Sequence, residues 1–418
     1  MKILCLLFML FCSASYADDT AHKFTVVTTP DTTTFSFNMT AKGEFTVDWG
    51  DGNVDTITRT DTTEATYSHT YENAGEYTIG FNGLATEYAD MNIPGYWTHP
   101  TISFQNNTNL AAIYGSLGAL FPTINGSQPE YSYTFAGCTN LSSEIPPDLF
   151  RGNYGQMKNG MFYNTFAKTK LHGSIPANLF SDITGDATHV GFSGTFAECK
   201  HLTGPIPEDL FAGITGLSRD WNFSNIFLMC TGLTGEIPEK LFSRIIVNDL
   251  KHQNVFNQAF RGCKNLSGFI PPKLFSGFTP GFVTWTNNIF AASGIAQQCP
   301  SGYYQYITGF EDYLGGYVSC VPCPDDYPNS VIGATDVRMC YWGDLRKLHI
   351  GDNTVGLLTY QTTEPALHIK VNDIVYYGAM TPIETNVMRN SEQKVKIRYN
   401  DIIYNLYDVT TIALPETD

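Results

Sequence analysis

Cysteines are the residues of this chain with the clearest capacity for chemistry, and eight of the ten fall into two groups of four. The first group recurs at one position of a repeated stretch and consists of Cys138, Cys199, Cys230 and Cys263. Buried cysteine behaves as a small apolar residue, so one thiol per repeat predicts a column of free, inert thiols. Disulfides between neighbouring repeats are the alternative in an oxidising compartment.

The second group crowds into residues 298–343 and consists of Cys299, Cys320, Cys323 and Cys340. This segment has few aliphatic residues, and disulfides can replace a hydrophobic core in such a case. A bridge between Cys320 and Cys323 would be strained. Of the two other connectivities we favour Cys299 with Cys320 and Cys323 with Cys340, while the C-x-x-C spacing leaves zinc as the alternative ligand chemistry.

Carboxylates are paired at two places, and each pair has a structural explanation. Asp48 and Asp51 lie in a W-G-D-G turn that could bind calcium, but the regular ligand alternation of an EF-hand is missing. Glu208 and Asp209 stand where a helix could begin, a place that favours acids. The motifs of zinc proteases, serine hydrolases, P-loop proteins and dinucleotide-binding proteins are missing too. We therefore predict no catalytic residues, no metal and no cofactor.

A repeated stretch organises the middle of the chain. Its clearest version, from Phe196 to Phe211, reads FAECKHLTGPIPEDLF. We call its five clear versions, each with the residues that flank it, copies 1 to 5; the versions run over 135–150, 166–180, 196–211, 227–242 and 260–275, so the leading Phe recurs after 31, 30, 31 and 33 residues. Degenerate copies begin at Phe104 and Phe290. A fixed period of this size predicts stacked supersecondary units.

The spacing within each copy predicts a short helix, a strand and a further helical turn. An aromatic residue four positions before the leading Phe and the Cys three positions after it make one helical stripe. In Leu-x-Gly-x-Ile-Pro, the Leu and Ile share a face of an extended strand, and the Pro suits the start of a helix. The residues beside the Gly then point outward, and our candidate binding residues are Glu144, His172, Ser174, Thr203, Pro205, Thr234, Glu236 and Phe269.

The pattern F-x-x-C-x-x-L-x-G-x-I-P-x-x-L-F resembles the BspA-like leucine-rich repeats of bacterial surface proteins. The resemblance covers residues 100–297 and implies that residues 91–297 form an α/β leucine-rich-repeat solenoid used for adhesion or protein binding. The pattern departs from the commoner form of the family by a longer variable loop after Leu-Phe, and it lacks the asparagine ladder of other leucine-rich repeats.

Residues 18–90 predict a small β-sandwich, because short alternating strands are separated by turns. The WGDG motif at 49–52 and the H-x-Y-x-x-x-G-x-Y pattern from His69 to Tyr77 resemble the PKD family, an immunoglobulin-like module of exported proteins. That resemblance implies a spacer or a binding module.

Residues 344–418 predict a C-terminal all-β domain of two similar hairpins. Each has a strand, an Asn-Asp turn and a second strand, from Leu367 to Tyr377 and from Val395 to Tyr404. With the cysteine-rich module at 298–343, the chain is predicted to be a multidomain protein.

The first 17 residues have the features of a secretory signal peptide. Lys2 provides a positive start, an apolar run extends from Ile3 to Phe11, and small residues precede a cleavage point after Ala17. No later stretch has the ~20 apolar residues of a membrane helix. The net charge of −16, without a basic cluster, argues against nucleic acid. We expect a secreted or cell-surface protein that does not insert into the membrane.

Two classes of function fit this sequence. The first is a binding or adhesion protein whose outward residues and variable loops at 151–164, 181–195 and 212–226 contact an extracellular protein or glycan. Tyr154, Tyr163 and Trp221 in these loops could make such contacts or could pack between copies. The second is an exported carbohydrate-active enzyme, whose two carboxylates only the fold could place. A structural spacer in a surface layer is a third possibility.

Overall fold

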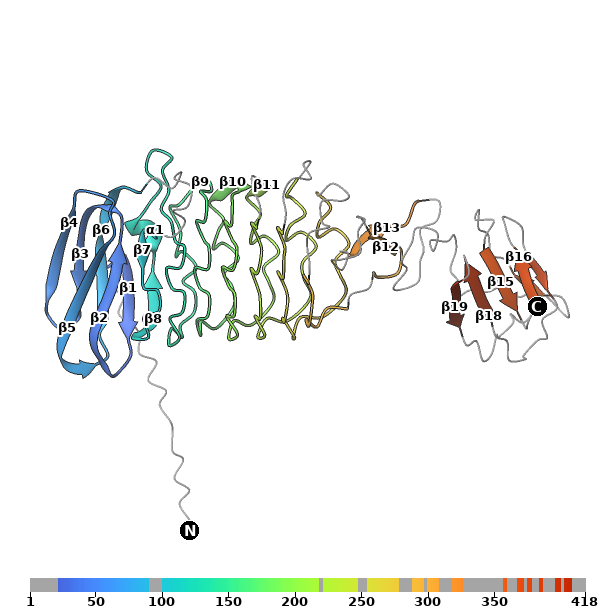
Figure 1. Cartoon of the computed structure of the whole chain (residues 1–418), viewed down its shortest axis with the longest axis horizontal. Coiled ribbons are helices and arrows are strands. Elements are labelled where there is room, and N and C mark those ends of the chain that lie inside the picture. Colours follow the sequence, from blue (N-terminus) through green and yellow to red (C-terminus); the bar gives the residue numbers. More distant parts are fainter. Residues whose placement is uncertain are drawn as a thin grey trace, which may run out of the picture.

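The computed structural model describes residues 22–89, 100–217, 221–246, 254–277, 288–296, 299–307 and 318–325, together with six strands between 356 and 407 (Figure 1). The predicted signal peptide, with its cleavage point at Ala17, lies outside the described residues. Cys340 and the two Asn-Asp turns at 372–373 and 400–401 also lie outside them.

The N-terminal part consists of two antiparallel sheets with a shared core. The larger sheet has the strand order β4-β3-β6-β1-β8 and the smaller one β5-β2-β7. Phe37 of the smaller sheet contacts Phe81 of the larger one at 5.2 Å between ring centroids, and Trp49 is fully buried. The strands are β1 (Phe24–Thr28), β2 (Thr32–Met39), β3 (Lys42–Asp48), β4 (Val54–Arg59), β5 (Ala65–Gly75), β6 (Thr78–Glu87), β7 (Ile102–Ser103) and β8 (Leu110–Gly115).

The degenerate leading copy joins these sheets to the repeats. It contributes β7 and β8, which pair with β2 and β1. Its Phe104 contacts Phe35 and Phe37 of β2 and also stacks on Phe135 of copy 1, with 5.7 Å between the ring centroids. One hydrophobic core therefore continues from the sheets into the repeats.

The predicted α/β leucine-rich-repeat solenoid is wrong. Among the described residues the only helix is α1 (Leu117–Leu120), which precedes copy 1, and the chain is nearly all strand and turn. The strands form several small sheets, none of which winds through the described copies as a continuous sheet. Figure 1 shows the copies side by side, from cyan through green to yellow, with little regular secondary structure.

The segment expected to be the first helix of each copy is a series of tight turns. Every fourth residue has a positive φ, which an α-helix does not allow; in copy 3 these are Val190, Gly194 and Glu198, with φ of 47°, 64° and 61°. The Phe196 N–H donates to the Ile226 carbonyl of the next copy at 3.0 Å instead of to a carbonyl four residues back. Successive four-residue turns and an α-helix both bring aromatic residues at i and i+4 to the same side of the chain. The spacing alone therefore could not distinguish the turns from a helix.

The segments expected to be strands and second helices are also irregular. The middle Gly of Leu-x-Gly-x-Ile has a positive φ, as at Gly204 (76°), so the chain makes single parallel bridges such as Gly204 with Leu233. After the Pro, turns with i to i−3 hydrogen bonds replace the helix, as between the Leu210 N–H and the Pro207 carbonyl. Among the described residues of the copies, regular pairing occurs only in the following loops, where β9 (Gly155–Gln156), β10 (Ile183–Ala187) and β11 (Ile214–Leu217) form a small parallel sheet.

Three columns of stacked aromatic rings fill the interior of the repeats. The leading Phe residues stack from Phe104 to Phe290 with 5.6 to 5.8 Å between successive centroids. The aromatics four residues earlier stack from Tyr131 to Phe256, and the closing Phe residues stack from Phe150 to Phe275. Each copy therefore presents three rings to each neighbour, and we call the arrangement of copies 1 to 5 the repeat stack.

The remaining strands follow the repeats. β12 (Tyr303–Ile307) pairs antiparallel with β13 (Val318–Pro322). The expected disulfide between Cys299 and Cys320 is confirmed, and Cys323 is disulfide-bonded as well. Farther on, a four-stranded sheet has the order β16-β15-β18-β19, and two further strands pair separately. These strands are β14 (Gly356–Leu358), β15 (Leu367–Val371), β16 (Ile374–Tyr377), β17 (Ile383–Thr385), β18 (Val395–Tyr399) and β19 (Ile402–Tyr407).

Replacing Phe196 by Ala should destabilise the repeat stack by about 3–5 kcal/mol, because the change leaves a cavity and removes two ring contacts at 5.6 Å. Urea unfolding followed by circular dichroism measures the effect. Thr203→Ala, an exposed change in the same copy, is the control and should shift stability by less than about 0.5 kcal/mol. Equal effects of the two changes would contradict a ring column as the main source of cohesion.

Candidate functional site

The candidate binding residues all lie on the surface of the repeat stack. Glu144, His172, Ser174, Thr203, Pro205, Thr234, Glu236 and Phe269 are exposed. Each flanks the middle residue of this segment, which is Gly in copies 2 to 5 and Ser143 in copy 1, while the Leu and Ile of the same segment are buried. The structure thus brings these side chains into one row along the stack.

The middle Gly of copies 2 to 5 has a φ of 74° to 85°, which favours glycine, and at two of these positions the neighbouring copy also comes close. A Cβ built on Gly173 would lie 3.1 Å from Cγ of Glu144, and one built on Gly268 would lie 2.9 Å from Cγ of Glu236. The residue after each Gly therefore lies over the Gly of the next copy. This contact, together with the positive φ, keeps the outward side chains in register and leaves their identity free to vary.

A second exposed group lies beside the small parallel sheet. Tyr154 and Trp221 have exposed fractions of 58% and 37%, so neither side chain is fully buried by packing. Tyr163 is half-buried and makes an edge contact with Tyr133. Ile246, with an exposed fraction of 61%, was not predicted; its N–H donates to the Thr215 carbonyl, which extends the pairing beyond β11.

Acidic residues after the Ile-Pro make ion pairs between copies. Glu208 pairs with Lys240 at 3.2 Å, Asp209 with Arg244 at 3.2 Å, and Glu239 with Lys273 at 3.9 Å. The expectation that these acids stabilise a helix start is wrong, because no helix forms there. The pairs join different positions of successive copies: Lys240 and Lys273 stand one position later in their copies than Glu208 and Glu239 in theirs.

The four thiols of the repeats are free and buried, as predicted. Each S–H donates to the carbonyl of the leading Phe of the preceding copy, as from Cys230 to Phe196 at 2.9 Å. Thr169 takes the cysteine position in copy 2 and donates to the Phe166 carbonyl. Burial raises the pKa of Cys138, Cys199 and Cys263 to about 12, and it raises the pKa of Cys230 well above its ordinary value.

The W-G-D-G turn uses its carboxylates for local structure. The Asp48 carboxylate accepts the Gly50 N–H, and the Asp51 carboxylate accepts the Asn53 N–H and lies 2.7 Å from Nε2 of His69. Burial of Asp51 favours its neutral form, but the hydrogen bonds from His69 and Asn53 outweigh burial and lower its pKa. In the described part of the chain, no three His, Cys, Asp or Glu side chains come together as a metal ion would require.

Glu130 is a buried acid that sequence reasoning missed. It lies just before copy 1, where its backbone pairs with Thr101 and its Oε1 accepts the Ser132 hydroxyl. Its Oε2 has no hydrogen-bond partner among the described residues. Burial raises the pKa of Glu130 to about 8, against the smaller opposing effect of the Ser132 hydrogen bond. The carboxyl is therefore mostly protonated at neutral pH.

In comparisons with known protein families, with curated proteins and with solved structures, no match to the chain was found. The resemblances to BspA-like repeats and to the PKD family therefore have no support outside the residues that suggested them. Where the structure describes the chain, no helix has both the length and the apolar character needed to cross a membrane.

The thiols Cys138, Cys199, Cys230 and Cys263 should resist iodoacetamide at pH 8 in the native protein and react fully in urea. The reason is that raised pKa values and burial deprive the reagent of an accessible thiolate. Peptide mass spectrometry after timed alkylation measures the modification of each thiol. Alkylation of any of the four as fast as a free peptide thiol would contradict the buried column.

Replacing Glu130 by Gln should flatten the dependence of stability on pH. In the native protein the pKa is about 8 against an ordinary 4.5, so the stability linked to protonation is fully present below about pH 4.5 and is lost as pH rises through 8. The variant should match the native protein near pH 4 and be more stable near pH 9, by a few kcal/mol at most. Thermal unfolding across this range measures the effect, with the exposed Glu72→Gln as control. Parallel curves for the native protein and Glu130→Gln would refute a raised pKa.

Proposed function

We propose that this chain is a secreted or cell-surface binding protein, and that its repeat stack holds an extracellular protein or glycan without catalysis. One observation carries the proposal: the core positions of the copies repeat, whereas the exposed row on the same segments does not. Glu144, Ser174, Pro205, Glu236 and Phe269 occupy the same place in successive copies and, apart from the two Glu, differ in chemical type.

A repeated core that carries varied exposed side chains is suited to recognising a ligand. The ring columns and the backbone hydrogen bonds between copies hold a rigid frame, and pre-organised side chains lose little conformational entropy on binding. The exposed Phe269, Tyr154 and Trp221 add aromatic surface, which is enriched at binding hot spots. The net charge of −16 favours a neutral or basic ligand over an acidic one.

An array of glycans and extracellular proteins probed with the full chain tests the proposal. We expect binding to at least one class, and a loss of about tenfold or more in affinity when Glu236→Ala and Phe269→Ala are combined. The exposed Lys264→Ala, outside the row, is the matched control and should leave binding unchanged. Binding to nothing on the array, together with concentration-dependent polymerisation in solution, would favour a structural spacer and refute the proposal.

A further inference from the structure

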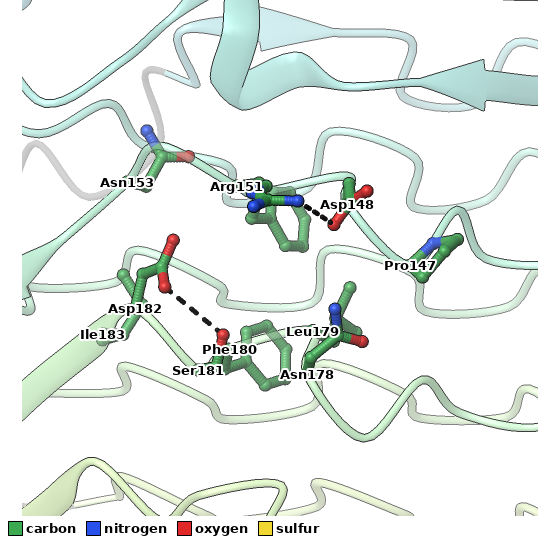
Figure 2. Close-up of a pocket in the computed structure, with 11 residues that line it drawn as sticks. Pro147, Asp148, Arg151, Asn153, Asn178, Leu179, Phe180, Ser181, Asp182 and Ile183 are labelled. Carbon is green, nitrogen blue, oxygen red and sulfur yellow. Dashed lines mark hydrogen bonds and ion pairs between the residues drawn. The ribbon is translucent and has the colours of Figure 1, made fainter.

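A small cavity lies between copies 1 and 2, away from the row of exposed residues (Figure 2). Its volume is about 210 Å³. The closing segment of copy 1 supplies Asp148, Arg151 and Asn153, and that of copy 2 supplies Asn178, Ser181 and Asp182. Phe150 and Phe180 lie beneath it, with exposed fractions of only 2% and 3%.

At the junction between copies 3 and 4, two long cations span the corresponding gap. Arg244 of copy 4 reaches Asp209 of copy 3 at 3.2 Å, and Lys240 reaches Glu208 at the same distance. Copy 2 has Asp182 at the position of Arg244 and Asn178 at the position of Lys240. Two long cations are thus replaced by two short side chains, and the gap stays open.

The polar groups around the cavity are only weakly engaged with one another. Asp148 lies 3.4 Å from Arg151 of its own copy. The Asp182 carboxylate accepts from the Ser181 hydroxyl and from the Gly152 N–H, both at 3.4 Å. These distances lie at the long end for hydrogen bonds, so a ligand could gain stronger bonds to the same groups.

The lining offers hydrogen-bond acceptors and donors at short range. The two carboxylates accept, the Arg151 guanidinium donates, and the Asn178 amide and the Ser181 hydroxyl do both. Two carboxylates against one guanidinium leave one negative charge, which disfavours phosphate, sulfate and acidic sugars. A ligand with several neighbouring hydroxyls, each able to donate and accept, matches this set.

We propose that this cavity is a subsite for a single uncharged sugar ring of a glycan ligand. The volume is below the 300–1,000 Å³ or so of pockets for drug-sized molecules, which suits one ring. The hydroxyls of such a ring can meet Asp148 and Asp182, while Asn178 and Ser181 can both donate to the ring and accept from it. The inference rests on the proposed binding function and narrows its ligand class to glycans.

Ligand-observed saturation-transfer NMR on the full chain tests the subsite, with free glucose, galactose, mannose, fucose and N-acetylglucosamine as probes. Asp182→Arg places a guanidinium opposite Asp148, as Arg244 lies opposite Asp209, so this variant should fold and fill the cavity. Asp182→Asn keeps the shape and removes the charge. Asp209→Asn, at the position of Asp148 in a copy whose gap is spanned, is the matched control, and thermal unfolding checks that each variant folds.

The expected result is binding of at least one sugar by the native chain, abolished by Asp182→Arg, weakened about tenfold by Asp182→Asn and unchanged by Asp209→Asn. Sugar binding that survives Asp182→Arg would overturn the subsite and leave the proposed function standing. No signal from any of the five sugars would also overturn it, and the array then decides the proposed function separately. A folded Asp182→Asn variant that binds the sugar with native affinity would contradict the proposal that the Asp182 carboxylate binds the sugar hydroxyls.

Discussion

Stacking of aromatic rings between successive copies is the interaction on which this structure depends. The leading Phe residues repeat at 5.6 to 5.8 Å from Phe104 to Phe290, and two further columns run beside them. Stacked aromatic pairs contribute about 0.5–1.5 kcal/mol each beyond the burial of their area, and three columns multiply this at every junction. Because the column starts within the core of the two N-terminal sheets, those sheets act as its first layer.

The backbone adapts to the rings. With φ positive at every fourth residue, alternate N–H groups point along the stack and donate to the next copy. Gly is one solution, but Lys168, Val190, Glu198 and Met229 also adopt this conformation, which costs free energy for residues with a side chain. Cross-copy hydrogen bonds and ring contacts offset that cost, so each copy needs its neighbours to keep its shape.

The sequence was sufficient to identify the buried residues of the repeats and their order. The leading Phe, the Leu and the Ile of each clear copy are buried, as is the Cys of the four copies that have one, and the residues beside the middle Gly or Ser are exposed. Secondary structure was not predictable in the same way, because four-residue turns and a helix share the i, i+4 spacing. Other features could not be predicted because they depend on contacts between neighbouring segments, and a pattern within one copy does not show those contacts. They are the ion pairs between copies, the protonated Glu130 and the cavity at Asp182.

The cavity between copies 1 and 2 exists only as long as those two copies stay adjacent. Every junction uses the same ring contacts and backbone bonds, so a gene duplication or loss of one whole copy would leave a stack that still folds. The same event at this junction would separate Asp148 from Asp182 and could set a cation such as Arg244 against the carboxylate instead. The length of such a protein is thus free to drift during evolution, whereas the order of its copies is what selection for a ligand would preserve.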